Sequence, residues 1–404
     1  MIELLVYVVG IFLAFYMAWC LGANDAANPT ECAVGAGVVS MKKALLLFVI
    51  FVAIGGILLG PFVMKTVDRG IIPREELDTD VVVAGSFSAV LAACLWVTFS
   101  SWAGIPVSTT HSTIGGVLGF GVVACFSYIN WGKLAMVVIS MVASPLLSIF
   151  VAWGLFHLFQ RYFKKPRSER SNLMMIYILI FFLSFGTLVS VFKEVLKWGA
   201  FLSISSSLIA SLGFSAVVVF ALKKTHGKFE AEKSLGYLLI IALCFSAFAF
   251  GANDMANSTG VFVTPTQKLT GGTPTGTVMF LLAALGALGI AVGGFTWGYR
   301  VIMTSAYRIT RLDPLSGAAA EYSNALTVFL FTVVPTFLVG FGIPISTTHS
   351  SIGSIIGVGL AMRGMAGVSR QTTSRILIFW ALTIPAAALI SGSVYWLLSW
   401  VMGI

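Results

Sequence analysis

Apolar segments follow one another from one end of the chain to the other. They fall at roughly residues 4–40, 44–64, 81–102, 104–127, 133–159, 172–192, 198–222, 234–263, 277–299, 315–340, 342–362 and 375–403. Runs of about 18 or more apolar residues are typical of transmembrane helices, because about 20 helical residues span the hydrocarbon core of a bilayer. The pattern therefore predicts an all-α integral membrane protein with about 12 transmembrane segments. The first run has no basic stretch before it, which indicates a retained span rather than a cleaved signal.

Charged residues are concentrated in the loops between these segments. If every segment crosses the membrane, the basic loops fall on one side, at residues 42–43, 161–170, 223–233, 300–311 and 363–375. The 65–80 loop, with five acidic and three basic residues, falls on the other. Because cytoplasmic loops carry an excess of Lys and Arg, this asymmetry predicts a multi-pass protein of the cell membrane with both termini outside the cytoplasm.

Composition excludes a soluble protein of this length. Hydrophobic residues make up 58% of the 404 residues and charged residues 10%. The net charge of +9 would suggest a nucleic-acid partner for a soluble protein, but here the positioning of basic residues in loops accounts for it. We therefore expect contact with the lipid bilayer and no nucleic acid. The five cysteines show no metal-ligand spacing, and we expect no disulfide framework.

One seven-residue motif occurs twice and interrupts an apolar segment each time. The copies are Gly22-Ala-Asn-Asp-Ala-Ala-Asn28 and Gly251-Ala-Asn-Asp-Met-Ala-Asn257. An acidic residue inside a bilayer is costly unless paired or hydrated, and a broken helix leaves backbone groups that must line a cavity or bind something. Carboxylate, amide and carbonyl oxygens suit a hard cation such as sodium. The cation ligands predicted from the motif are Asn24, Asp25, Asn28, Asn253, Asp254 and Asn257. Helix capping could explain one copy, but not two matched copies.

A second motif is also duplicated. Gly104-Ile-Pro-Val-Ser-Thr-Thr-His-Ser-Thr-Ile-Gly115 matches Gly342-Ile-Pro-Ile-Ser-Thr-Thr-His-Ser-Ser-Ile-Gly353 at ten of twelve positions. Proline followed by hydroxyl residues and an apolar run is typical of a helix start, where free amides and the helix dipole favour anions. The hydroxyl residues predicted to surround an oxyanion are Ser108, Thr109, Thr110, Ser346, Thr347 and Thr348. The alternative explanation of these hydroxyl residues is ordinary helix capping.

The two motifs together define an internal repeat. We predict a first transmembrane repeat at residues 1–160, connecting segments with a basic cytoplasmic loop at 161–233, and a second repeat at 234–404. The repeats begin an odd number of spans apart, which predicts opposite orientations, as in many secondary transporters. Broken helices or re-entrant hairpins are expected, and residues 104–127 and 342–362 either span or re-enter.

Some polar residues have alternative interpretations. Glu321 aligns with Val83 of the first repeat, and Glu31 aligns with Gly260 of the second. Glu321 is a candidate sodium ligand at a third cation site, or a gate. Alternatively, it lines an aqueous vestibule. The matched His111 and His349 suit either proton sensing and hydrogen bonding near the site, or a structural role in the hairpin backbone.

The four motif copies resemble those of the inorganic phosphate transporter family, the sodium- or proton-coupled phosphate symporters. The resemblance covers both halves of the chain. It implies phosphate uptake at a site between the repeats, with Asn24, Asp25, Asn253 and Asp254 binding both phosphate and the coupling ion, and both Ser-Thr-Thr runs binding phosphate. Where the first family motif usually continues with Ser and Gly, this chain has Pro29, Thr30 and Glu31, which leaves the ion stoichiometry open.

The function predicted is sodium-coupled symport of inorganic phosphate by alternating access. The protein is expected to be a secondary active transporter rather than an enzyme, with sodium as co-substrate and no cofactor. Proton coupling, a metal–phosphate complex and another oxyanion such as sulfate or arsenate remain alternatives, and a homodimer is one option. An intramembrane hydrolase or a channel are rival classes. Every candidate catalytic residue is duplicated here, which disfavours a single triad.

Overall fold

The computed structural model describes residues 2–63, 71–73, 76–163, 168–226, 231–270, 276–339 and 345–403. Over these ranges the chain is helical with short turns and no strand, which confirms the predicted all-α class. The α-helices are α1 (Ile2–Asp25), α2 (Ala27–Gly35), α3 (Met41–Val63), α4 (Thr79–Trp102), α5 (Thr109–Ala124), α6 (Trp131–Phe163), α7 (Glu169–Ser190), α8 (Ala200–His226), α9 (Ala231–Thr270), α10 (Gly276–Gly293), α11 (Tyr299–Tyr307), α12 (Pro314–Val339), α13 (Thr347–Arg363) and α14 (Arg370–Met402). Short 3-10 or π turns occur at η3 (Phe126–Tyr128), η4 (Val191–Val195), η5 (Gly294–Gly298) and η6 (Gly364–Gly367).

Nine stretches of the described chain are long and apolar enough to cross a membrane. They run from Val6–Gly35 at one end of the chain to Arg370–Met402 at the other. The helices α5 and α13, which follow the duplicated hydroxyl motif, have only 16 and 17 residues. At 1.5 Å per residue they are about 24–26 Å long, less than the hydrocarbon core of about 30 Å. The count of about 12 spans stays a prediction.

Helices α4 and α5 form a hairpin that enters and leaves at the same end of the molecule. The backbone amide of Asn130, just after α5, donates to the carbonyl of Ile71, just before α4, at 2.8 Å. Ile71 and Ile72 also pack with Phe120 of α5 in a small apolar cluster. The base of the hairpin is therefore closed, and α5 returns toward the end from which α4 came.

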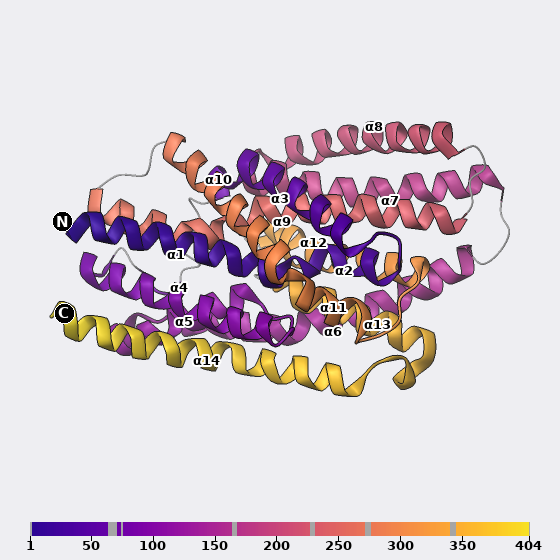
Figure 1. Cartoon of the computed structure of the whole chain (residues 1–404). Helices are drawn as coiled ribbons and strands as arrows, with labels where there is room; N and C mark the ends of the chain where they lie inside the picture. Colours follow the sequence, from indigo (N-terminus) through magenta and orange to yellow (C-terminus); the bar gives the residue numbers. More distant parts are fainter. Residues whose placement is uncertain are drawn as a thin grey trace.

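Helices α12 and α13 repeat this arrangement at the other end. The amide of Ser369, just after α13, donates to the carbonyl of Ile309, just before α12, also at 2.8 Å. Figure 1 shows α5 and α13 directed toward opposite ends of the bundle. Each motif-bearing helix therefore returns toward the end of the molecule from which the preceding helix came, and the two do so at opposite ends. Whether they span or re-enter the membrane stays a prediction.

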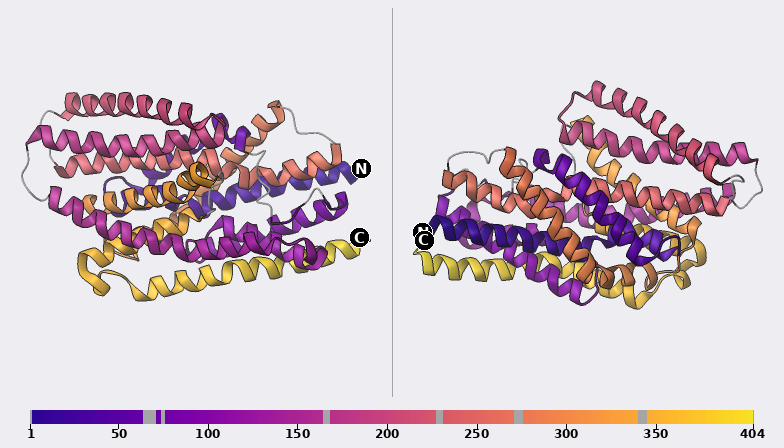
Figure 2. Two further views of the ribbon diagram at one scale, coloured as in Figure 1. Left: turned by 180° about the vertical axis from the view of Figure 1, so that it is seen from behind. Right: turned by 45° about the horizontal axis from the view of Figure 1, so that its top comes forward.

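Several basic loops meet at the end where α12 and α13 have their base. The hydroxyl of Tyr307, at the end of α11, donates to the carbonyl of Val34 near the end of α2, at 3.1 Å. Basic residues at the helix ends there are Lys42 at the start of α3, Arg308 just after α11 and Arg363 at the end of α13. The two termini lie together at the opposite end (Figure 2). This distribution agrees with the charge asymmetry of the loops, while the assignment of one end to the cytoplasm stays a prediction.

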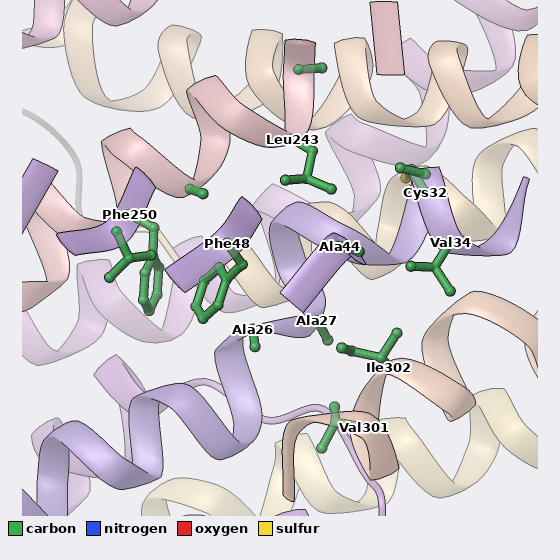
Figure 3. Close-up of a cluster of buried hydrophobic side chains, with 14 of the residues drawn as sticks. Ala26, Ala27, Cys32, Val34, Ala44, Phe48, Leu243, Phe250, Val301 and Ile302 are labelled. Carbon is green, nitrogen blue, oxygen red and sulfur yellow. The ribbon is translucent and has the colours of Figure 1, made fainter. Parts of the chain in front are cut away.

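The apolar core surrounds the point where α1 ends and α2 begins. Figure 3 shows Ala26 and Ala27 at this junction, with side chains of α3, α9 and α11 around it. Phe48 of α3 and Phe250 of α9 pack there with ring centroids 5.8 Å apart. Small residues at the break let the neighbouring helices approach closely, so the break is held by packing on several sides.

The break predicted at the second motif copy is wrong, because α9 continues without interruption through residues 251–257. Matched glycines bring α1 and α9 against their neighbours. A Cβ at Gly22 of α1 would overlap the carbonyl oxygen of Ile290 in α10. A Cβ at Gly251 of α9 would overlap the carbonyl oxygen of Val52 in α3. The two glycines occupy equivalent positions of the duplicated motif, and close helix contact of this kind in membranes needs small residues.

We expect Gly22→Ala and Gly251→Ala each to destabilise the protein, because the added methyl group meets backbone that cannot rotate away. Overpacking of this kind costs about 1–3 kcal/mol. Gly154 of α6 has no neighbouring atom within 4 Å of a built Cβ, so Gly154→Ala is the control. It should be neutral or stabilising by up to about 1 kcal/mol. The measurement is thermal unfolding of the detergent-solubilised protein, and equal melting temperatures for all three variants would contradict the packing argument.

Candidate functional site

Asp25, the last residue of α1, is contacted by threonine hydroxyl groups of both hairpins. The hydroxyl of Thr109 at the start of α5 donates to Asp25 Oδ2 at 2.7 Å. The hydroxyl of Thr348 at the start of α13 approaches Asp25 Oδ1 at 3.5 Å. Asp25 is buried, with 3% of its surface exposed. One carboxylate thus lies between the hydroxyl motifs of the two halves of the chain.

Asn28, one turn along from Asp25, contacts the same motif of the second half. Its Nδ2 donates to Thr348 Oγ1 at 3.1 Å and approaches Thr347 Oγ1 at 3.5 Å. Its Oδ1 is buried and has no hydrogen-bond partner. A buried carbonyl-type oxygen without a donor costs free energy, which a bound cation would offset.

Asn24 holds the tip of the first hairpin. Its Nδ2 donates to Ser101 Oγ at 2.9 Å and to the carbonyl of Ile105 at 3.2 Å, and its Oδ1 accepts from the amide of Val107 at 3.0 Å. The side chain is fully buried. In this conformation Asn24 positions the segment that carries Ser108 and Thr109, and the remaining lone pair of Oδ1 is its only capacity for a ligand.

Ser108 and Ser346 cap the two motif helices in the same way. Ser108 Oγ accepts from the amide of His111 at 3.1 Å, and Ser346 Oγ accepts from the amide of His349 at 3.2 Å. Helix capping, the alternative explanation of the motif, therefore applies to these two serines. Their O–H groups can still donate hydrogen bonds. Both helix starts point their positive dipole ends into the same region, which favours an anion there.

The matched histidines touch each other behind the hydroxyl runs. The rings of His111 and His349 meet edge to face with centroids 4.9 Å apart. His349 also stacks on Trp380 of α14 at 3.7 Å. Trp380 in turn donates its indole N–H to the carbonyl of Pro106 in the first hairpin at 3.0 Å. The histidines and Trp380 therefore connect the two hairpin tips, which agrees with the structural interpretation of these histidines.

The second aspartate of the duplicated motif lies in the same region. Asp254 of α9 is partly buried and lies close enough to Asp25 for the two charges to repel. Thr110 is also partly buried. The side chains of Asn253 and Asn257, and residues 342–344 of the second hydroxyl motif, lie outside what the structure describes. Of the predicted site residues, those that the structure brings together are Asp25, Asn28, Thr109, Asp254, Thr347 and Thr348.

Glu321 belongs to a different polar cluster. Its Oε1 accepts from Ser246 Oγ of α9 at 2.7 Å, and Cys32 of α2 lies nearby. The carboxylate of Glu31 lies nearby and accepts from Ser351 Oγ of α13. The structure therefore groups Glu321 with Glu31 rather than with Asp25.

Sequence analysis missed several residues that shape the site. Ser101, Trp380 and Ser351 have no unusual sequence context, because they contact the motifs only through packing of distant helices. The repeat offers one signal for Ser351, which directly follows the matched Ser-Thr-Thr-His-Ser run.

Different groups of the site are suited to binding an anion and to binding a cation. Threonine hydroxyls and two helix starts can donate hydrogen bonds to an oxyanion, whereas Asp25, Asp254 and the free oxygen of Asn28 can bind a cation. Within the described part of the chain, no group of three or more His, Cys, Asp or Glu side chains has the arrangement of a metal centre. The oxygen ligands present suit a hard cation better than a transition metal.

Two opposed hairpins that meet beside one interrupted helix, α1–α2, inside a multi-pass bundle are typical of a membrane transporter. The profile of the phosphate transporter family matches residues 21–391. The chain belongs to this family, and it is a transporter rather than an enzyme.

Two relatives and one solved structure illustrate the similarity. A predicted phosphate permease of Pyrococcus abyssi is 36% identical over 97% of this chain and 98% of its own length. One from Haemophilus influenzae is 32% identical over 98% of this chain and 96% of its own. A solved structure of a protein described as "The sodium-dependent phosphate transporter" is 32% identical, with a TM-score of 0.86 over 98% of this chain and 99% of that one.

We expect Asn24→Leu to destabilise the protein, because it keeps side-chain volume but removes three buried hydrogen bonds and leaves their partners unsatisfied. Each unsatisfied buried group costs about 1–3 kcal/mol. Ser101→Ala removes only one of the three contacts and should cost less. Thermal unfolding in detergent measures both variants. A larger loss for Ser101→Ala than for Asn24→Leu would show that Asn24 does not organise the hairpin tip.

Proposed function

We propose that this protein carries inorganic phosphate across the cell membrane together with a cation, most simply sodium. The observation that carries the proposal is the position of Asp25 between Thr109 of one hairpin and Thr348 of the other. Each repeat supplies hydroxyl donors, and the broken helix supplies a carboxylate, at one buried place. Membership of the phosphate transporter family supports phosphate as the substrate.

Phosphate would bind between the two helix starts. Ser108, Thr109 and Thr110 approach from α5, and Ser346, Thr347 and Thr348 approach from α13. Hydroxyl and amide donors at helix N-termini bind oxyanions without a Lys or Arg, because the helix dipoles supply partial positive charge. Asn24 and Asn253 would orient this shell, and the protonated oxygens of phosphate would donate to Asp25 and Asp254.

The need for a bound cation follows from the negative charges that the site would hold. Two carboxylates and a polyanion repel strongly in a poorly polar environment, so they can share a site only if cations lie between them. Asn24, Asp25, Asn28, Asn253, Asp254 and Asn257 are the proposed sodium ligands at this place, with Glu321 as a more distant acidic site. The free oxygen of Asn28 beside Asp25 supports a cation there. Similarity to a solved transporter that is described as sodium-dependent favours sodium over protons.

Transport would proceed by alternating access. The hairpins enter from opposite ends and meet through His111 and His349. A small displacement of one hairpin relative to the other would open the central site to one side of the membrane, which is the behaviour expected of inverted repeats around one site. With basic loops inside, the protein would be a multi-pass cell-membrane protein whose termini face outward.

We expect phosphate and sodium to bind interdependently. Sodium should raise the affinity for phosphate, and phosphate should raise the affinity for sodium by the same factor, because coupling free energies are reciprocal. The measurement is radiolabelled phosphate uptake and binding in proteoliposomes with imposed sodium or proton gradients, competed with sulfate. Phosphate binding that is unchanged when choline replaces sodium at constant pH would contradict sodium coupling and favour protons. Uphill accumulation would exclude a channel.

We expect Asp25→Asn and Asp254→Asn each to abolish coupled uptake in a protein that still folds, because each removes a cation ligand but little volume. Thr109→Val should weaken phosphate binding by about 1–3 kcal/mol, since it removes a donor and keeps the shape. Thr113→Val is the matched control, because Thr113 Oγ1 donates to the carbonyl of Thr109 within its own helix at 3.0 Å. Full transport by Asp254→Asn would argue against a site built from both repeats.

A further inference from the structure

Trp380 of α14 contacts both hairpins at once. Its indole N–H donates to the carbonyl of Pro106, two residues before Ser108, at 3.0 Å. Its ring stacks on that of His349 in the second hairpin, with centroids 3.7 Å apart and an interplanar angle of 18°. Trp380 is 6% exposed and His349 is 1% exposed, so both contacts lie inside the bundle. One side chain therefore bridges the two segments that meet at Asp25.

His349 is also held by α6. Its Nδ1 lies 3.2 Å from the carbonyl oxygen of Met141, and because a carbonyl only accepts, Nδ1 carries the hydrogen in this contact. That carbonyl has no helical partner, because Pro145, four residues later inside α6, has no N–H to donate to it. The proline thus leaves an acceptor for the imidazole. The ring of His349 is therefore fixed in orientation where Trp380 stacks on it.

The bridge joins two separate pairs of packed helices. Helix α5 of the first hairpin packs against α14, where a Cβ at Gly119 would overlap the α14 backbone. Helix α13 of the second hairpin packs against α6, where a Cβ at Gly357 would overlap the α6 backbone. The stack of Trp380 on His349 connects one pair to the other, and the contact between His111 and His349 does the same.

Trp380 has no tryptophan counterpart in the other half of the chain. Helices α6 and α14 are equivalent, because each follows a motif helix, has 33 residues and contains an internal proline, Pro145 or Pro385. Aligning these prolines places Ser140 opposite Trp380. Ser140 Oγ donates to the carbonyl of Val137 within α6 at 2.7 Å. One half of the chain thus supplies an aromatic bridge where the other supplies a small residue bonded to its own helix.

We propose that Trp380 is a positioning residue that holds the two hairpin tips together and sets the rate at which they separate. Separation must break the hydrogen bond to Pro106 or the stack on His349, because a single side chain makes both contacts. The inference deepens the proposed function and rests on it, since it assigns a residue to the step by which alternating access would open the site. The described contacts of Trp380 are with Pro106 and His349 rather than with Asp25 or Thr109.

The test is exchange of radiolabelled phosphate by the full-length protein in proteoliposomes, with sodium and phosphate saturating on both sides. Trp380→Phe keeps an aromatic ring over His349 but removes the donor to Pro106. We expect its exchange rate to rise about two- to tenfold, because the lost bond stabilises the closed tips and is already broken when they separate. The phosphate concentration for half-maximal exchange should change by less than about twofold, since no substrate ligand is lost.

Trp96→Phe is the matched control. The indole N–H of Trp96 in α4 donates to Thr383 Oγ1 of α14 at 3.1 Å, and Trp96 is 8% exposed, so this variant also loses a buried indole donor. Its partner is a side chain of the outer helix rather than a hairpin tip, so we expect exchange at the wild-type rate. Exchange by Trp380→Phe that is no faster than exchange by Trp96→Phe would contradict the proposal.

Hydrogen exchange of backbone amides distinguishes a bridge from a purely local contact. In protein without phosphate, Trp380→Phe should speed amide exchange at both tips, residues 103–108 and 346–351, by about two- to tenfold, because both become exposed when the tips separate. Trp96→Phe should leave residues 346–351 unchanged. Faster exchange confined to residues 103–108 would show that Trp380 supports the first tip alone, and the bridge would then be wrong.

His349→Leu breaks the same bridge from the second hairpin and replaces Trp380→Phe if that variant does not fold. It removes the ring on which Trp380 stacks but keeps the hydrogen bond to Pro106, so amide exchange should again rise at both tips. Amide exchange equal to that of wild type would overturn the bridge. Wild-type protein that exchanges no phosphate would contradict the proposed function, whereas the amide measurements would still decide whether Trp380 holds the tips together.

Discussion

The carboxylate of Asp25 lies at a helix end inside an apolar bundle, and its need for partners organises the centre of the molecule. In water such a group would be hydrated, but within a membrane protein the partners must come from the chain itself or from a bound ion. Here Thr109 and Thr348 supply hydroxyls from two hairpins. The two hairpins meet beside the break between α1 and α2, where Asp25 is the last residue of α1.

The arrangement of the two hairpins also requires helices to pack closely against one another. Small residues allow one helix backbone to approach another, and the matched positions use the same device twice. A Cβ at Gly115 of α5 would lie 2.7 Å from the carbonyl oxygen of Ile384, and one at Gly353 of α13 would lie 2.7 Å from that of Pro145. Each short hairpin arm therefore lies directly against a long outer helix, α14 or α6. Close contacts of this kind in membranes depend on small residues at the interface.

The two halves of the chain differ at positions where only one of them carries an acidic residue. Asp25 and Asp254 are matched in the duplication, whereas Glu31, which accepts from Ser351, and Glu321, which accepts from Ser246, are unmatched. The polar contacts around Asp25 follow the duplication, whereas those of Glu31 and Glu321 have no equivalent in the other half of the chain.

The sequence by itself determined the membrane class, the duplication, the family and most residues around Asp25. Hydropathy and exact repetition are local properties, so they can be read without knowing which helices touch. Only the tertiary structure decided that α5 returns to the end of the molecule from which α4 came, that Asn24 holds the hairpin tip, and that Glu321 accepts from Ser246. These outcomes depend on contacts between residues far apart in the sequence, such as 75 and 77 positions. Such contacts are selected by the packing of whole helices, which no local pattern specifies.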